Sequence, residues 1–117
     1  MLNAEHPFEA VDLLYRAAVE PHLWPEALEQ FARSVGCIGM AMIPITPDST
    51  AGLIVSPSMQ EVEQDYKDTW WRHDTRVGRI FERRLARGVF AEADLFGDEE
   101  LQRDPFRQDF CRRFGIG

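Results

Sequence analysis

The sequence predicts an α+β fold, in which helices surround a small antiparallel sheet. Apolar residues recur at helical spacing in five separate segments. Two apolar runs of strand length also stand on either side of a short polar turn. The predicted order is helix, helix, hairpin, two helices, strand, loop and helix. Because the helices are grouped around a meander, we expect one domain, residues 1–117, built as a sandwich of a sheet and helices.

Residues 1–36 predict a pair of helices. In residues 21–36, Pro25 suits the first helical position, and Gly36 suits the left-handed position that follows a helix end. The apolar stripe of this second helix consists of Trp24, Leu28, Phe31, Ala32 and Val35. The first helix, residues 8–19, has a stripe that consists of Phe8, Val11, Leu14, Tyr15 and Ala18.

Residues 37–117 predict the sheet and the remaining helices. The apolar runs 37–45 and 51–56 read as two strands of a hairpin, joined by the polar turn 47–50. Residues 89–96 read as a third, short strand that enters a loop.

Three further helices have start or stop signals. The first covers residues 56–73 and begins with a possible capping box of Ser58 and Glu61. Asp74 can cap the second, which ends at Gly88. The third begins at an Asp-Pro pair, carries phenylalanines at four-residue spacing and stops at a glycine: Asp104, Pro105, Phe106, Phe110, Phe114 and Gly115.

The net charge of −7 is unevenly distributed along the 117 residues. Residues 1–66 hold 2 basic and 10 acidic side chains, residues 67–87 hold 7 and 3, and residues 88–117 hold 4 and 7. Phosphate neutralisation supplies most non-specific affinity for DNA, so this chain alone is not expected to bind duplex DNA. The sequence has no run of about 18 apolar residues and no secretory leader. We therefore expect a cytoplasmic location and no membrane association.

The sequence contains no motif of an enzyme: no Gly-rich phosphate loop, G-x-S-x-G, HExxH or CxxC. Cys37 lies in an apolar run, so we expect a small buried thiol. Catalysis by Cys111 or Asp74 would need a base beside the nucleophile, and no spacing in the sequence supplies one. A metal site needs several converging donors, which the isolated histidines do not provide. We predict no catalysis, no metal and no cofactor.

The stretch "DTWWRHDTR" (68–76) mixes large aromatic and charged side chains. On a helix, Tyr66 and Trp70 share a face, Asp74 lies one turn further on, and Trp71 is rotated by about 100°. One interpretation is a pair of core aromatics followed by a helix cap. The other is the wall of a pocket, where aromatic rings supply contact area and the carboxylate accepts a hydrogen bond from a ligand.

Three segments in order resemble the N-terminal region of LuxR-type helix-turn-helix transcriptional regulators. They are "LYRAAVEPHLWPEALEQFARSVG", "YKDTWWRHDTRVGRI" and "GVFAEADLFGDEELQRDPFRQDFCRRFGIG", and the similarity covers most of residues 10–117. Asp74-Thr75-Arg76 stands where the family often reads Asp-Pro-Arg. The resemblance implies a sensor domain of GAF- or PAS-like fold, placed ahead of a DNA-binding domain.

The resemblance also implies a ligand site. Asp74 matches the family aspartate that accepts a hydrogen bond from the amide of an acyl-homoserine lactone, and Tyr66 and Trp70 roughly match the family's pocket aromatics. Thr75 departs from the family proline, so the expected ligand is a small apolar or amphipathic molecule of unspecified identity. The candidate ligand-binding residues are Tyr66, Trp70, Asp74, Met40 and Met42.

The implied function is signal sensing or dimerisation for a bacterial regulator. A GAF- or PAS-like sheet has more strands than the three predicted here, so the resemblance implies a fold that is incomplete at Gly117. We expect a homodimer that covers its open sheet or docks its aromatic helices, and DNA binding only through a further C-terminal domain. The alternative is a stand-alone interaction module that pairs with a full-length regulator and needs no ligand.

Overall fold

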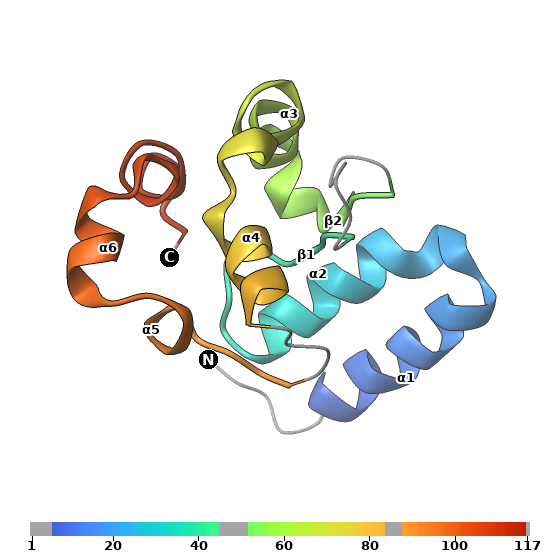
Figure 1. The fold of residues 1–117 in the computed structure, drawn as a ribbon. Coiled ribbons are helices and arrows are strands. Elements are labelled where there is room, and N and C mark those ends of the chain that lie inside the picture. Colours follow the sequence, from blue (N-terminus) through green and yellow to red (C-terminus); the bar gives the residue numbers. More distant parts are fainter. Residues whose placement is uncertain (1–5, 45–51, 84–87, 117) are drawn as a thin grey trace. The chain divides into compact units, whose positions relative to one another are not determined.

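The computed structural model of the chain describes residues 6–44, 52–83 and 88–116. These residues are mostly helical and contain one two-stranded antiparallel sheet (Figure 1). The chain divides into two compact units, Met1–Asp65 and Tyr66–Gly117. None of the described helices is both long enough and apolar enough to cross a membrane.

The predicted GAF- or PAS-like sheet flanked by helices is wrong. The described part of the chain pairs only β1 (Ala41–Met42) with β2 (Ile54–Val55), and the two strands form a small antiparallel ladder. The two predicted strands pair over a much shorter length than their apolar runs, and the turn 47–50 lies outside the described residues. The prediction that an open sheet drives dimerisation depended on this fold and falls with it.

The predicted third strand, residues 89–96, is also wrong. Residues 88–91 have no regular structure, and α5 (Glu92–Leu95) follows. Asp94 Oδ2 accepts a hydrogen bond from the backbone N–H of Ala91 at 2.8 Å, which satisfies a donor at the helix start. Aspartate and glutamate are unfavourable in strands. The capping contact therefore favours a helix start here, although the apolar pair Val89 and Phe90 favours a strand.

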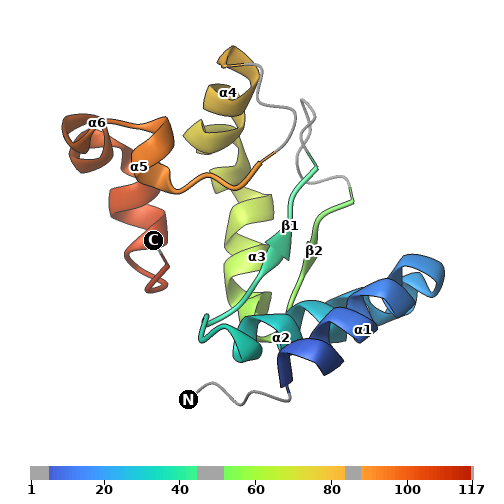
Figure 2. The ribbon, with the colours of Figure 1, turned by 90° about the horizontal axis from the view of Figure 1, so that it is seen from below.

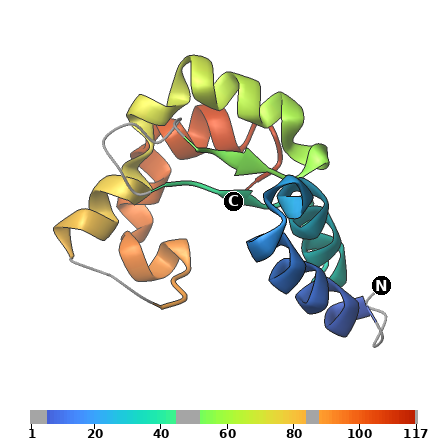
Figure 3. The ribbon, with the colours of Figure 1, turned by 90° about the vertical axis from the view of Figure 1, so that its right-hand side faces the viewer.

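The first unit begins with the two predicted helices, which are confirmed. Helix α1 (His6–Val19) leads through a 3₁₀ turn, η1 (Pro21–Leu23), into α2 (Trp24–Ser34). The two helices lie side by side (Figure 3). Pro25 lies in the first turn of α2, where it costs no hydrogen bond. Gly36 has a φ of 75°, the left-handed conformation expected after a helix end.

The faces that α1 and α2 bury are rich in alanine. The core of this helix pair consists of Leu13, Ala17 and Ala27, and Leu14, Leu23 and Trp24 pack against it. Most of the apolar stripe predicted for α1 lies outside this core, since Phe8, Val11 and Tyr15 are exposed. A second set of residues at helical spacing, Ala10, Leu13 and Ala17, is buried in its place.

Strands β1 and β2 lie side by side (Figure 2), and Ser56 follows β2 directly in the chain. It is fully buried, its N–H donates to the carbonyl of Met40 at 2.9 Å, and its Oγ accepts from the N–H of Met40 at 3.0 Å. These bonds extend the pairing of Ala41 with Val55 and of Met42 with Ile54. The hydroxyl thus satisfies a backbone donor next to the short ladder.

A 3₁₀ turn, η2 (Pro57–Met59), leads into α3 (Gln60–Asp68), which begins in the first unit and ends in the second. The expected capping box of Ser58 and Glu61 is wrong, because Ser58 lies inside η2 and its N–H donates to Glu29 Oε1 of α2 at 2.8 Å. A carboxylate from a distant helix therefore satisfies this orphan donor.

The second unit is built from short helical segments. After η3 (Trp70–His73) come α4 (Thr75–Glu82), α5, α6 (Asp98–Arg103) and a π-helical turn, η4 (Phe106–Cys111). The predicted capping of α4 by Asp74 is confirmed, since its side chain accepts from the N–H of Arg76. The predicted stop at Gly115 is also confirmed, with a φ of 70°.

Arginines connect these segments. Arg79 of α4 pairs with Glu100 of α6, and its guanidinium lies 4.8 Å from the ring centre of Phe96. The N–H of Gly97 donates to Glu100 at 3.1 Å. This backbone bond, followed by the Arg79 contact, lowers the pKa of Glu100. Arg83 donates to the carbonyl of Asp94 at 2.7 Å.

Gly39 is predicted to tolerate no side chain. A Cβ placed there would clash with Cγ of Met59 and would lie 2.9 Å from Oγ of Ser58. We expect Gly39→Ala to lower the free energy of unfolding by about 1–3 kcal/mol, the usual cost of overpacking. Urea unfolding followed by far-UV circular dichroism measures this.

Gly78→Ala is the matched control. Gly78 lies within α4, and nothing stands within 4 Å of a Cβ built there. Since alanine is the better helix former, this change should stabilise the chain by about 0.5–1 kcal/mol. Equal effects of the two substitutions would contradict the close packing at Gly39.

Candidate functional site

Five aromatic rings gather in the second unit. The ring centres of Phe106 and Phe110 lie 5.2 Å apart, and those of Phe110 and Phe114 lie 5.4 Å apart. Tyr66 lies 6.3 Å from Phe106 and 6.0 Å from Phe110, and Trp70 lies 5.7 Å from Phe110. These separations fall in the favourable range for ring pairs. We call this set, Tyr66, Trp70, Phe106, Phe110 and Phe114, the aromatic cluster.

The carboxylate of Asp74 lies beside the aromatic cluster, and only 1% of its side chain is exposed. Oδ2 accepts from the Tyr66 hydroxyl at 2.8 Å and from Nη2 of Arg76 at 3.0 Å. Oδ1 accepts from the backbone N–H and from Nε of Arg76, at 3.1 and 2.9 Å. A carboxylate offers about four acceptor positions, so the chain itself supplies a donor for each.

Arg76 neutralises this buried carboxylate. Burial alone would lower the pKa of its guanidinium, but the hydrogen bonds and charge of Asp74 outweigh burial, and the pKa is raised. The guanidinium also lies 4.9 Å from the ring centre of Phe106, a cation–π distance. The bidentate pair satisfies the condition under which a buried charge is tolerated.

The backbone places these groups together. Helix α3 ends at Asp68, and η3 turns the chain before Asp74 takes the extended conformation of a helix-capping residue. Tyr66 reaches Asp74 from the last turn of α3. Arg76 lies in the first turn of α4, so a local separation of two residues allows both its N–H and its guanidinium to reach the same carboxylate.

Thr75 has a separate role at this point. Its hydroxyl donates to Oδ2 of Asp104 at 2.6 Å, and Oδ1 of Asp104 accepts from the N–H of Phe106 at 3.1 Å. The start of α4 is therefore linked to the start of the last helical segment. A proline at position 75 could not make the hydroxyl contact.

A small hollow of about 270 Å³ adjoins Asp74. Its lining consists of Arg72, His73, Asp74, Thr75, Asp104, Pro105 and Phe106. The volume lies just below the range of about 300–1,000 Å³ that is usual for small-molecule sites. Because the Asp74 carboxylate is almost fully covered, a ligand could reach it only by displacing Tyr66 or Arg76.

The structure brings together three of the five candidate residues, Tyr66, Trp70 and Asp74. Met40 and Met42 belong to the first unit, where Met40 is half-buried beside Ser56 and Met42 is 40% exposed. Trp71 has different surroundings from Trp70: Arg72 lies 5.1 Å from its ring centre. Both indoles are partly buried, and the ligand role of Trp70 stays a prediction.

Sequence reasoning missed Arg76 and Phe106. The spacing of Asp74 and Arg76 was a usable signal, because the N–H of the second residue after a cap commonly donates to the capping side chain. Phe106 was placed on a helical stripe, but no local pattern indicates that Tyr66 and Trp70 are its neighbours.

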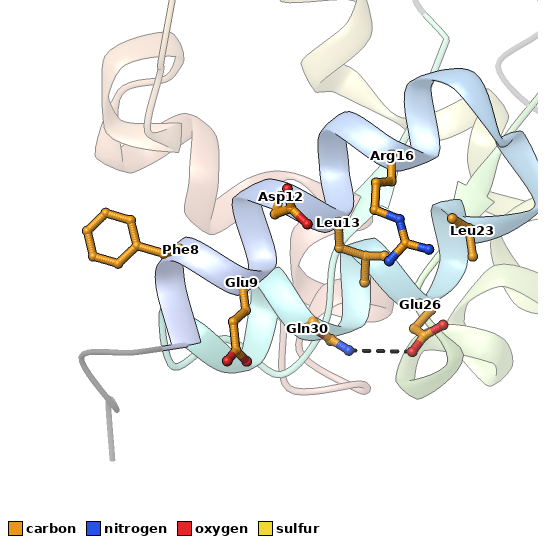
Figure 4. Close-up of a pocket in the computed structure, with 8 residues that line it drawn as sticks. All are labelled: Phe8, Glu9, Asp12, Leu13, Arg16, Leu23, Glu26 and Gln30. Atoms are coloured by element: carbon orange, nitrogen blue, oxygen red, sulfur yellow. Dashed lines mark hydrogen bonds between the residues drawn. The ribbon is translucent and has the colours of Figure 1, made fainter.

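A larger hollow of about 510 Å³ lies between α1 and α2 (Figure 4). It is lined by Leu13 and Leu23 together with Phe8, Glu9, Asp12, Arg16, Glu26 and Gln30. Gln30 donates to Glu26 at 3.4 Å. A third hollow, of about 560 Å³, lies between α4 and α6 and contains Arg79 and Glu100. The mixed charges of both hollows give no indication of a particular ligand.

The cysteines occupy opposite environments. Cys37 is exposed, so the expectation of a buried thiol is wrong; the chain turns after Gly36 and Cys37 lies outside the strand. Cys111 is buried, and burial raises the pKa of its thiol. Among the described residues, no group of three or more His, Cys, Asp and Glu side chains could hold a metal ion.

No family model matches this chain, and neither the curated proteins nor the solved structures include a match. The resemblance to LuxR-type regulators therefore stays a prediction.

Asp74→Asn tests the buried pair with Arg76. Asparagine can still cap α4, but it loses the charge that Arg76 neutralises. We expect the free energy of unfolding to fall by about 1–3 kcal/mol, the scale of a charged or unsatisfied buried hydrogen bond. Thermal and urea unfolding measure the change, with Thr75→Val as a neighbour that leaves Asp74 intact. A neutral effect of Asp74→Asn would show that Asp74 acts only as a cap.

The two thiols should react at very different rates. Because the thiolate is the reactive form, Cys37 should react with a chromogenic thiol reagent in the folded chain, and Cys111 only after unfolding. One thiol per chain is expected to react rapidly with the reagent in buffer, and two are expected to react in concentrated urea. Cys37→Ser should abolish the fast reaction; a persistent fast thiol would place Cys111 at the surface.

Proposed function

We propose that this chain is a non-catalytic sensing or dimerisation region of a bacterial, cytoplasmic transcriptional regulator of the LuxR type. The support from the sequence is the resemblance of three ordered segments to such regulators. The observation that carries the proposal is the contact of Tyr66 with Asp74 inside the aromatic cluster, at 2.8 Å. These are residues that the resemblance assigns to ligand recognition.

The proposed ligand is a small apolar or amphipathic molecule with one amide or hydroxyl donor. Its donor would replace the Tyr66 hydroxyl on Oδ2 of Asp74, and its apolar part would pack against the aromatic cluster. Arg76 would stay paired with the carboxylate throughout, because its two side-chain bonds and its backbone bond use the remaining acceptor positions. Displacement of Tyr66, the last buried residue of α3, would couple binding to a movement at the end of that helix.

A second reading is a stand-alone module that pairs with a full-length regulator and needs no ligand. The observation that favours it is that every acceptor position of Asp74 has an internal donor. In this reading, the cluster only stabilises the second unit.

A thermal-shift screen with small amides and alcohols separates the two readings, because a ligand of the native state raises the unfolding temperature. For any hit, the affinity should change in opposite directions in two variants. Asp74→Asn should weaken binding by about 1.5–3 kcal/mol, as a charged hydrogen bond is lost. Tyr66→Phe should strengthen it, because the competing hydroxyl is gone.

Thr75→Val is the matched control, since Thr75 lines the adjoining hollow but donates to Asp104. Its affinity should equal that of the unchanged chain. Equal affinities of all three variants would remove Asp74 from the binding site. A screen without hits, together with co-purification of a regulator, would favour the second reading.

A further inference from the structure

Helix α1 buries small side chains and exposes large ones. Ala10, Leu13 and Ala17 are 1, 8 and 0% exposed, whereas the exposed fractions of Phe8, Tyr15 and Val19 are 80, 76 and 80%. At about 100° per residue, the second set lies opposite the first around the helix axis. Figure 4 shows Phe8 pointing away from α2 and Leu13 pointing toward it. We call the face with Phe8, Val11, Tyr15 and Val19 the outer face of α1.

A helix that is apolar on two opposite faces normally has a partner on each side. On α1, one partner is α2. The outer face has two aromatic and two β-branched side chains in one contiguous stripe, which is the kind of exposed patch that marks an interaction site. Val11, also on this face, is 41% exposed.

The two flanks of the outer face differ in charge. Asp12 and Arg16 lie along one flank, and the apolar Leu14 and Ala18 lie along the other. Among the residues that the structure describes, neither Asp12 nor Arg16 takes part in an ion pair. Both charges are therefore available to a partner that brings the opposite sign to the same flank.

We propose that the outer face of α1 is a homodimer interface, where α1 packs antiparallel against α1 of a second copy. In an antiparallel pair of helices, like flanks meet. Centring the pair on the stripe places Phe8 opposite Val19 of the second copy, and Asp12 within one residue of Arg16 of the second copy. The two-fold symmetry then forms this ion pair twice. A parallel pair would set the charged flank against the apolar flank.

The available area suits a weak dimer. Two copies of Phe8 and Tyr15 alone bury roughly 600 Å², at about 200 Å² per fully exposed aromatic side chain and with 80 and 76% of these two side chains exposed. With the valines and the flanking charges, the interface approaches the lower end for specific complexes, about 1,200 Å². A second copy also fits better than an anionic lipid surface, which the net charge of −7 would repel. This proposal concerns the first unit and does not depend on the function of the Asp74 cluster.

Sedimentation equilibrium over a range of concentrations tests the interface. The unchanged chain should dimerise with a micromolar dissociation constant. Tyr15→Glu should raise that constant at least about thirtyfold, the effect of removing an interface hot spot. Ile38→Gln is the control: Ile38 is 59% exposed but lies outside α1, so the constant should not change. Far-UV circular dichroism checks that each variant keeps its helices.

A charge swap tests the ion pairs. Asp12→Arg should weaken the dimer because it sets two arginines together, and the double change Asp12→Arg with Arg16→Asp should restore it. A single substitution that merely damaged α1 would not be rescued in this way. Failure of the double variant to restore dimerisation would overturn the antiparallel arrangement.

Disulfide trapping tests the orientation, in a Cys37→Ser background that removes the exposed thiol. A mixture of the Phe8→Cys and Val19→Cys chains should form the mixed disulfide. Each variant alone should form little, since like positions would stand about 16 Å apart at 1.5 Å per residue, beyond disulfide reach. A chain that stays monomeric at its highest soluble concentration, or a dimer that Tyr15→Glu leaves intact, would overturn the proposal.

Discussion

The second unit depends on one buried carboxylate. Asp74 begins α4, receives the hydroxyl of Tyr66 from α3 and binds the guanidinium of Arg76, which in turn lies over Phe106 of the last helical segment. A buried charge without these donors would cost several kcal/mol. Each donor therefore has to be in place, so a single side chain sets the relative positions of three short helical segments that have little stability alone.

The two units solve the problem of a small core differently. In the first, alanines allow α1 and α2 to pack, and little apolar area is buried per residue. In the second, aromatic rings supply the area, and arginines connect the segments through Glu100, Glu92 and the carbonyl of Asp94. Some of the basic residues between 67 and 87, which make the charge of the sequence uneven, thus bind acidic side chains or carbonyl groups within the same unit.

The features that could be predicted correctly from the sequence are those that local interactions determine. The place of Pro25 in the first turn of α2, the capping of α4 by Asp74 and the stop at Gly115 each follow from the chemistry of one residue. The sheet was overestimated because an apolar run indicates burial but not the length of pairing. The choice of face on α1 failed because two opposite faces both have helical apolar spacing. At the candidate site, helical spacing predicted that Tyr66, Trp70 and Asp74 lie near one another, whereas the approach of Phe106, some 30–40 residues further on, has no local signal.

The distribution of the three tryptophans gives each unit its own optical label. Trp24 packs against the alanine-rich core of the helix pair, while Trp70 stands among coupled phenyl and phenol rings. Aromatic rings held rigidly at fixed angles to one another give circular dichroism in the near ultraviolet. They lose this dichroism when they rotate freely. The near-ultraviolet dichroism of this chain therefore reports mainly on the rigidity of the aromatic cluster, while Trp24 emission follows the helix pair.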